Sequence, residues 1–198
     1  MELKRIVMTG GPCGGKSEAV ARVREHFAAQ GWTVYVIAET ATELILGGIA
    51  PWTCPSRKAF QQAQIRLQIE KEDLYLEYAR RIGGERVLVL MDRGTVDSKA
   101  FLGDEVYAEA IAELGWTEEE LLARYDQVYH LISAAKAGFY TTLNNAARRE
   151  PPEEAIALDD AHLHAWENHP CRCVIPNFPD FEAKMECLIE TMERTVSG

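Results

Sequence analysis

Residues 10–17 read Gly-Gly-Pro-Cys-Gly-Gly-Lys-Ser, and the interpretation of the whole chain starts from them. They match the phosphate-binding pattern G-x-x-x-x-G-K-[ST]. The preceding residues 3–9, LKRIVMT, end in an apolar run that predicts a buried strand. The following residues 17–30, SEAVARVREHFAAQ, carry apolar side chains at helical spacing. A strand, a glycine-rich loop and a helix in this order are the context in which the pattern indicates phosphate binding.

The residue types of this loop suit a nucleotide. Successive backbone N–H groups of a tight loop point into one concavity, and the start of the helix adds the positive end of its dipole. Glycines allow positive φ angles and a close approach of the anion. Lys16 can reach the β- and γ-phosphates, and the Ser17 hydroxyl can bind Mg²⁺. We therefore expect ATP or GTP as substrate, Mg²⁺ as cofactor, and a nucleotide-binding set of Gly11, Pro12, Cys13, Gly14, Gly15, Lys16, Ser17 and Glu18.

Length and composition indicate one domain spanning 1–198, because 198 residues with 47% hydrophobic and 26% charged side chains are ordinary for a soluble α/β protein. The net charge of −10 argues against nucleic acid or an anionic membrane as the main partner. No signal segment is expected, and no run reaches the roughly 20 apolar residues that a membrane span needs. Five cysteines, one of them inside the loop, favour a reducing cytoplasmic setting.

Apolar runs and helical periodicity alternate along the rest of the chain. Further strands are expected at 33–38, 86–91, 127–132 and 172–175. Further helices are expected at 41–46, 56–82, 153–168 and 179–195, with two or three short ones within 97–125. This alternation implies a parallel sheet covered on both faces, with ligands outside the carboxyl ends of the strands. The expected fold class is α/β, a three-layer P-loop NTPase fold with a kinase-like five-stranded parallel sheet.

The long helix at 56–82 needs a packing face. Apolar spacing predicts that this face is formed by Phe60, Ala63, Leu67, Leu74 and Tyr78. Gln64 and Gln68 on the same helix could read a substrate, but we expect them on a solvated face. Further along, Thr117 followed by Glu120 predicts a capping box at the start of a short helix.

Two carboxylates that follow predicted strands are candidates for chemistry. Asp92 follows the run 86–91, where phosphate-loop proteins hold the acid that orients Mg²⁺; the alternative is a cap on the next turn. Arg93-Gly94 comes next rather than a second, water-activating carboxylate, and no Asn-Lys-x-Asp string occurs, which favours transfer of phosphate to a small molecule. Glu39 follows the second strand and is either the base for a substrate hydroxyl or the N-cap of the next helix.

Two later stretches contain groups that could act on a ligand. The loop 138–152, GFYTTLNNAARREPP, holds Arg148 and Arg149. A movable arginine that closes over the phosphates would stabilise charge and exclude water, so we expect a lid here rather than only solvated arginines. Histidines and cysteines also gather at 162–173, but the spacing of Cys171 and Cys173 is tighter than that of common zinc pairs, and no zinc is expected.

Several strings along nearly the whole chain carry a resemblance to a known family. They are GGPCGGKS, AETATELILGGIAPW, MDRGTVDSKAFL, YDQVYHLISAA, FYTTLNNAARREPPEEAIALDD, AWENHP and VIPNFPDFEAK. The chain resembles the AAA_28-type family of P-loop predicted ATPases and kinases. That family includes the P-loop domain of TRPL translocation defect protein 14-like proteins and is similar to the nicotinamide riboside kinase domain of bacterial NAD regulators. The most distinctive strings are Asp92-Arg93-Gly94 and the run from Asn144 through Arg148 to Glu150.

The resemblance implies that Arg148 rather than Arg149 is the lid arginine and that Asn177 lies near the nucleotide base. The candidate catalytic residues are Lys16, Glu39, Asp92, Arg93 and Arg148, and the metal ligands are Ser17 and Asp92. The leading expectation is an ATP- or GTP-dependent kinase that acts on a small hydroxylated, nucleoside-like metabolite. The alternative is a regulatory nucleotide-binding protein with slow hydrolysis and no small-molecule acceptor. Either Asp92 or Glu39 could be the base.

Overall fold

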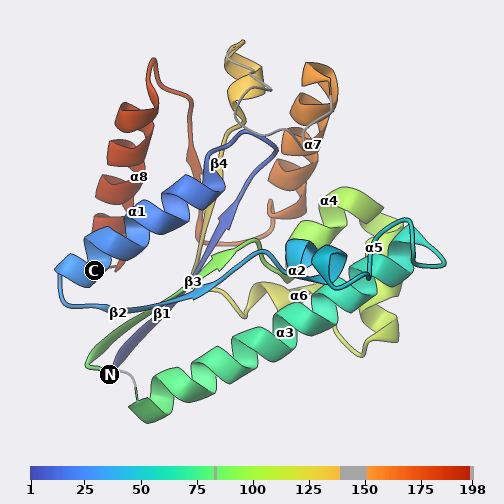
Figure 1. Cartoon of the computed structure of the whole chain (residues 1–198), viewed down its shortest axis with the longest axis horizontal. Coiled ribbons are helices and arrows are strands. Elements are labelled where there is room, and N and C mark those ends of the chain that lie inside the picture. Colours follow the sequence, from blue (N-terminus) through green and yellow to red (C-terminus); the bar gives the residue numbers. More distant parts are fainter. Residues whose placement is uncertain (83, 139–150, 197–198) are drawn as a thin grey trace.

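Five parallel strands form a single sheet in the order β2-β3-β1-β4-β5 (Figure 1). The computed structural model describes residues 1–82, 84–138 and 151–196. The strands are β1 (Glu2–Thr9), β2 (Thr33–Ile37), β3 (Arg86–Asp92), β4 (Gln127–Leu131) and β5 (Arg172–Ile175). The predicted α/β class, with helices on both faces of a kinase-like five-stranded parallel sheet, is confirmed.

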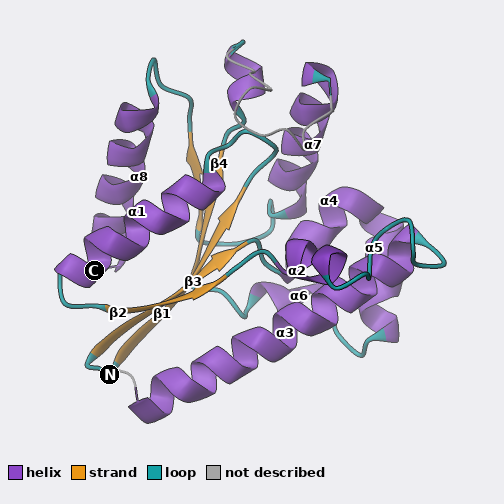
Figure 2. Ribbon diagram, viewed as in Figure 1, coloured by secondary structure: helices purple, strands orange, loops and turns teal. Residues whose placement is uncertain are grey.

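Helices connect the strands at the positions that the sequence predicts, to within about three residues (Figure 2). They are α1 (Lys16–Ala29), α2 (Thr40–Leu46), α3 (Arg57–Ile82), α4 (Ser98–Leu102), α5 (Asp104–Glu113), α6 (Glu118–Leu122), α7 (Pro152–Ala165) and α8 (Phe181–Val196). Short 3-10 turns occur at Thr95–Asp97 and Ala134–Ala137. The predicted capping box is present, since the Thr117 hydroxyl accepts from the Glu120 amide over 3.2 Å. In the part of the chain described, every helix is too short or too polar to span a membrane.

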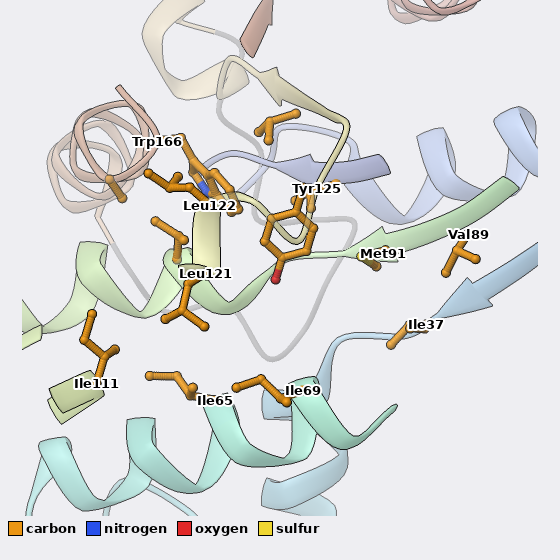
Figure 3. Close-up of a cluster of buried hydrophobic side chains, with 14 of the residues drawn as sticks. Ile37, Ile65, Ile69, Val89, Met91, Ile111, Leu121, Leu122, Tyr125 and Trp166 are labelled. Atoms are coloured by element: carbon orange, nitrogen blue, oxygen red, sulfur yellow. The ribbon is translucent and has the colours of Figure 1, made fainter. Parts of the chain in front are cut away.

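The two faces of the sheet bury separate apolar clusters. On one face, Val89 and Met91 of β3 pack with Ile65 and Ile69 of α3 and with side chains from α5, α6 and α7 (Figure 3). On the other face, Leu88 and Leu90 of β3 contribute to a cluster that contains the buried residues of α1 and α8. Because helices cover both sides, residues 87–91 of β3 are all apolar instead of alternating with polar ones.

The strand register aligns the carboxyl ends of the strands that precede the candidate residues. Met8 pairs with Asp92 across β1 and β3, and Ile37 pairs with Met91 across β2 and β3. The carboxyl ends of β1, β2 and β3 are therefore level. The glycine loop, Glu39 and Asp92 follow these ends directly, which brings them to the same edge.

The packing face of α3 differs from the predicted one. Leu74 and Tyr78 are 53% and 54% exposed, so their assignment to the packing face is wrong. The buried stripe consists of Phe60, Gln61, Gln64, Ile65, Gln68, Ile69, Glu72 and Ala79. Apolar spacing was misleading because half of this stripe is polar.

The solvated face predicted for Gln64 and Gln68 is also wrong, since their exposures are 4% and 2%. Gln68 Nε2 donates to Glu72 Oε1 over 2.8 Å. Glu72 also accepts from the Tyr125 hydroxyl over 2.9 Å and from Arg124 Nε over 2.6 Å. Hydrogen bonds thus compensate for the burial of Gln68 and Glu72, and partners from a distant segment such as Tyr125 leave no local signal in the sequence.

Candidate active site

Five backbone carbonyls of the glycine loop accept hydrogen bonds from Lys16 at its end and from residues of later segments. Lys16 Nζ lies 3.0 Å and 2.9 Å from the first two carbonyl oxygens. The Ser133 hydroxyl, the Ala134 amide and Lys184 Nζ donate to the next three. In order, the five acceptors are Gly10, Gly11, Pro12, Cys13 and Gly14. These partners occupy the carbonyl side of the loop, and backbone N–H groups on the opposite side of such a loop are the donors that bind an anion.

Asp159 of α7 holds the first turn of the loop. Its Oδ1 accepts from the Gly11 amide over 2.8 Å, from His130 Nε2 over 3.0 Å and from the Ser133 amide over 3.2 Å. Lys136 Nζ lies 2.8 Å from its Oδ2. Burial alone would raise the pKa of Asp159, but these partners outweigh burial and hold that pKa well below its usual range. No motif or local pattern in the sequence points to Asp159 or His130.

The approach of Asp159 also explains one glycine of the loop. A Cβ on Gly11 would lie 2.7 Å from the Cβ of Asp159, which is too close for any side chain. Gly15 is required for another reason, since its φ of +88° is in the left-handed region. Lys16 begins α1 directly after it.

The ammonium group of Lys16 lies inside the loop. Desolvation, with a smaller contribution from Arg93, lowers its pKa to about 8. Asp92 and Glu39 oppose this shift, so three charged side chains predicted from the sequence act on Lys16. An anionic partner such as a phosphate would therefore stabilise the charged form of the Lys16 amine.

Ser17, Glu39 and Asp92 line one cavity of about 440 Å³ beside the loop. Asp92 Oδ1 is buried and has no hydrogen-bond partner among the described residues. Burial raises the pKa of Asp92, and the nearby Lys16 ammonium counteracts this rise. An unpaired carboxylate oxygen and a hydroxyl facing the same space are hard oxygen ligands that suit Mg²⁺. The two predicted metal ligands therefore fit the cation.

Glu39 occupies the N-cap position of α2, but its side chain makes no capping hydrogen bond. It accepts instead from Arg93 Nε over 2.7 Å and from the Thr42 hydroxyl over 2.7 Å. Burial would raise the pKa of Glu39, yet Arg93, the Thr42 hydroxyl and Lys16 together outweigh burial and lower that pKa. The capping alternative therefore does not describe this side chain, which stays ionised near neutral pH.

Arg93 is a buried hub with a φ of +71°. Its Nη1 donates to the Gly10 carbonyl over 3.3 Å and lies 3.3 Å from Asp97 Oδ1. It also contacts His162 Nε2. Since His162 Nδ1 lies 2.8 Å from the Leu158 carbonyl, the network assigns the proton to Nδ1 and leaves Nε2 to accept from Arg93. Burial and the charge of Arg93 lower the pKa of His162 to about 3.

A larger cavity of about 640 Å³ opens on the other side of Glu39. It lies between α2, α3 and α7 and reaches Pro12 of the glycine loop. Glu39 and Thr42 line both cavities, so the two spaces meet at these residues. Other residues of its wall include Phe60, Gln61, Gln64, Arg93, Phe101 and Leu158.

Asn177 lies at a third cavity, of about 200 Å³, that adjoins Cys13 and Gly14 of the loop. Its amide donates to the Ser133 carbonyl over 2.9 Å, and its oxygen lies 3.3 Å from Lys184 Nζ. Asn177 thus supports the wall beside the loop; its contact with a nucleotide base stays a prediction. Burial lowers the pKa of Lys184 to about 8. Sequence reasoning missed Lys184, although it is in helical register with the apolar Leu188.

The loop arginines and the histidine and cysteine cluster are the remaining candidates. Arg148 and Arg149 lie outside the described residues. Of the histidine and cysteine cluster, His162 faces Arg93 while His164 pairs with Asp104 at 3.0 Å. The described residues contain no group of three or more histidine, cysteine, aspartate or glutamate side chains that could hold a metal ion.

A parallel sheet whose first strand leads into this glycine loop, with Lys16 inside the loop, defines a P-loop nucleotide-binding protein. The match of a family model agrees with this class. The model, AAA_28, is described as an AAA domain and matches residues 5–184, so the chain belongs to that family. Searching the curated proteins gives no match to this chain.

Proposed function

We propose that the protein is a kinase that transfers the γ-phosphoryl group of ATP or GTP to a hydroxyl of a small, nucleoside-like metabolite. One observation carries this proposal: Glu39 lines both the cavity that holds Ser17 and Asp92 and the larger cavity beyond it. A carboxylate between a phosphate site and a second cavity is placed to accept a proton from a hydroxyl in that cavity.

The loop and Lys16 bind the donor phosphates. Backbone N–H groups, the dipole of α1 and the Lys16 ammonium all favour anionic oxygens at this point. Ser17 and Asp92 would hold Mg²⁺, whose chemical contribution when bound is to neutralise charge on the phosphate oxygens. The base of the nucleotide is assigned to the side of the loop where Asn177 lies.

The transfer step exchanges one P–O bond for another. The acceptor oxygen forms a bond to the γ-phosphorus while the bond to the β–γ bridging oxygen breaks and the nucleoside diphosphate leaves. The acceptor proton goes to Glu39, which Arg93 keeps ionised and oriented through the 2.7 Å contact between Nε and Oε1. We therefore assign the base to Glu39 and the cation to Asp92.

The residue after Asp92 favours a kinase over a hydrolase. Hydrolytic ATPases commonly have a carboxylate there, whereas this chain has Arg93, whose guanidinium is buried in contacts with Glu39 and Asp97. Such a group cannot accept a proton from water. The alternative function, a regulator with slow hydrolysis, would need its attacking water to be activated by another residue.

The test is the consumption of ATP and GTP with and without a panel of nucleosides and vitamins. Acceleration by an acceptor, together with a phosphorylated product seen by mass spectrometry, is the expected result. The Lys16→Ala protein serves as the blank for contaminating kinases. Slow hydrolysis that no compound accelerates would replace the kinase with the regulatory function.

A further inference from the structure

The larger cavity presents a buried polar atom that no described residue satisfies. Gln61 is 4% exposed, and its Oε1 lacks a hydrogen-bond partner. Gln64, three positions later on α3, lies in the same wall and is also 4% exposed. By contrast, Gln62 Nε2 donates to the Ala110 carbonyl over 3.2 Å and to Glu113 over 2.8 Å. Of these three neighbouring glutamine side chains, Gln61 and Gln64 line the cavity and Gln62 does not.

Buried carboxamides select their ligands strongly. Each offers one acceptor oxygen and an NH₂ group with two donors. Leaving such a group unpaired is unfavourable, so a ligand that lacks the matching atoms is rejected. Two amides one turn apart suit a ligand with neighbouring donors and acceptors along one edge. The edges of nucleobases have this pattern, and glutamine reads adenine in this way in nucleic-acid recognition.

The other walls suit a flat ring. Phe60 and Phe101 contribute aromatic surface, and Ile45 and Leu158 contribute aliphatic surface. The cavity volume of about 640 Å³ is in the range, about 300–1,000 Å³, of sites for small organic ligands. Apolar walls with a few polar groups fix both the plane and the rotation of such a ring.

Among the described residues, the charges that line this cavity balance. Its described lining contains two acidic residues, Glu39 and Glu154, and two basic residues, Arg57 and Arg93. Glu39 and Arg93 neutralise each other at 2.7 Å. Arg57 is exposed, and its Nη1 lies 3.5 Å from the Phe101 carbonyl. A site for an acceptor that already carries phosphate would need an excess of cations.

We propose that Gln61 and Gln64 read the hydrogen-bonding edge of an uncharged planar base, so that the acceptor is a nucleoside and not a nucleotide or a simple sugar. The assignment of its hydroxyl to Glu39 depends on the proposed kinase function. Recognition of the base does not, because it can be measured as binding alone.

The binding experiment uses the whole chain with Mg²⁺ and a non-hydrolysable ATP analogue. The probes for calorimetry are adenosine, guanosine, cytidine and uridine, their 5′-monophosphates, and methyl β-D-ribofuranoside, which has no base. At least one nucleoside should bind about 100-fold more tightly than the methyl riboside, as expected when buried polar groups lose their partners. Its 5′-monophosphate should bind more weakly than the nucleoside.

The variants assign the contact to particular amides. Gln61→Leu and Gln64→Leu should each weaken nucleoside binding by about 10-fold or more. The matched control Gln62→Leu should change it by less than about twofold, because Gln62 faces α5. Should a leucine variant fail to fold, Gln61→Glu and Gln64→Glu test the same contacts, since each replaces the NH₂ donor with an oxygen.

Two failures can be told apart. Base recognition is overturned if no nucleoside binds, if the methyl riboside binds equally well, or if Gln61→Leu and Gln64→Leu bind like the native chain. A parallel assay for phosphoryl transfer tests the kinase function. Glutamine-dependent binding without transfer would uphold recognition and refute the kinase, whereas phosphorylation of a polyol alone would do the reverse.

Discussion

Asp159 Oδ1 accepts a hydrogen bond from the backbone nitrogen of Gly11 over 2.8 Å, and this contact joins α7 to the phosphate loop. The same helix places His162 against Arg93 on the next turn. Helix α7 therefore supports both the phosphate loop and Arg93, the partner of Glu39. Changes to Asp159 should therefore affect nucleotide binding through the loop that it supports.

Asp159→Asn should lower the free energy of unfolding by roughly 3 kcal/mol, because it leaves the buried His130 without its carboxylate and Lys136 with one charge partner fewer. The affinity for Mg-ATP should fall as well. Urea unfolding and calorimetric titration measure the two effects. Asp160→Asn is the matched control, since Asp160 is exposed and also pairs with Lys136; its change should stay within about 0.5 kcal/mol. Equal changes in the two variants would contradict this role of Asp159.

Lys16→Ala should abolish nucleotide binding and leave the fold intact, because the ammonium lies inside the loop and not in either apolar cluster. A ligand that binds the native state raises the melting temperature by mass action. The native chain should therefore show a thermal shift with Mg-ATP, and the variant none. An unchanged shift would rule out this loop as the nucleotide site.

Asp92→Asn and Glu39→Gln should both reduce turnover, by about 100-fold or more if they remove the cation ligand and the base. Their effects on substrates should differ. The first should raise the requirement for Mg²⁺, and the second should leave the affinity for Mg-ATP nearly unchanged. Steady-state kinetics at several Mg²⁺ concentrations distinguishes them. Full activity of Asp92→Asn would make that side chain structural.

His162 should make stability depend on pH. Its pKa is about 3 in the folded chain against 6.5 for the ordinary side chain, so the unfolded state binds the extra proton between these values. The stabilisation is therefore complete above pH 6.5 and is lost as the pH falls towards 3, with a slope of up to about 1.4 kcal/mol per pH unit. Urea unfolding between pH 7 and about pH 5 measures it.

His162→Gln should flatten that pH dependence, because glutamine does not titrate. The exposed His164 provides a control of opposite sign. Asp104 raises the pKa of His164, so its small contribution is present at acid pH and is lost as the pH rises. His164→Gln should leave the steep acid loss of stability in place, because an exposed ion pair contributes little. The interpretation of His162 fails if its variant keeps the steep acid loss.

Features with a local cause could be predicted from the sequence. The glycine loop, the apolar run of β3 and the capping box of Thr117 each depend on neighbouring residues, and the alternation of strands and helices then implied a parallel sheet. Glu39 and Asp92 were found because each follows a strand. Their shared cavity could be anticipated from the rule that ligands bind beyond the carboxyl ends of parallel strands.

Features with a distant cause could not be predicted. Asp159 and Gly11 are 148 positions apart, and nothing near either residue indicates the other. Gln68 is buried against Glu72, and the other partners of Glu72, Tyr125 and Arg124, come from a later segment of the chain. The contacts of Arg93 with Glu39 and His162 likewise join residues that are far apart in the sequence.

The register of the sheet has a consequence for how this chain can vary. Met8 pairs with Asp92, and Ile37 pairs with Met91. The backbone hydrogen bonds between these strands therefore fix the distance from the phosphate loop to the carboxylates at the carboxyl ends of β2 and β3. The segment between α2 and α3 can therefore lengthen, shorten or change composition without moving these groups. A protein built in this way can change the wall of its larger cavity, and so the ligand which that cavity admits, while the phosphate loop and its two carboxylates keep their positions.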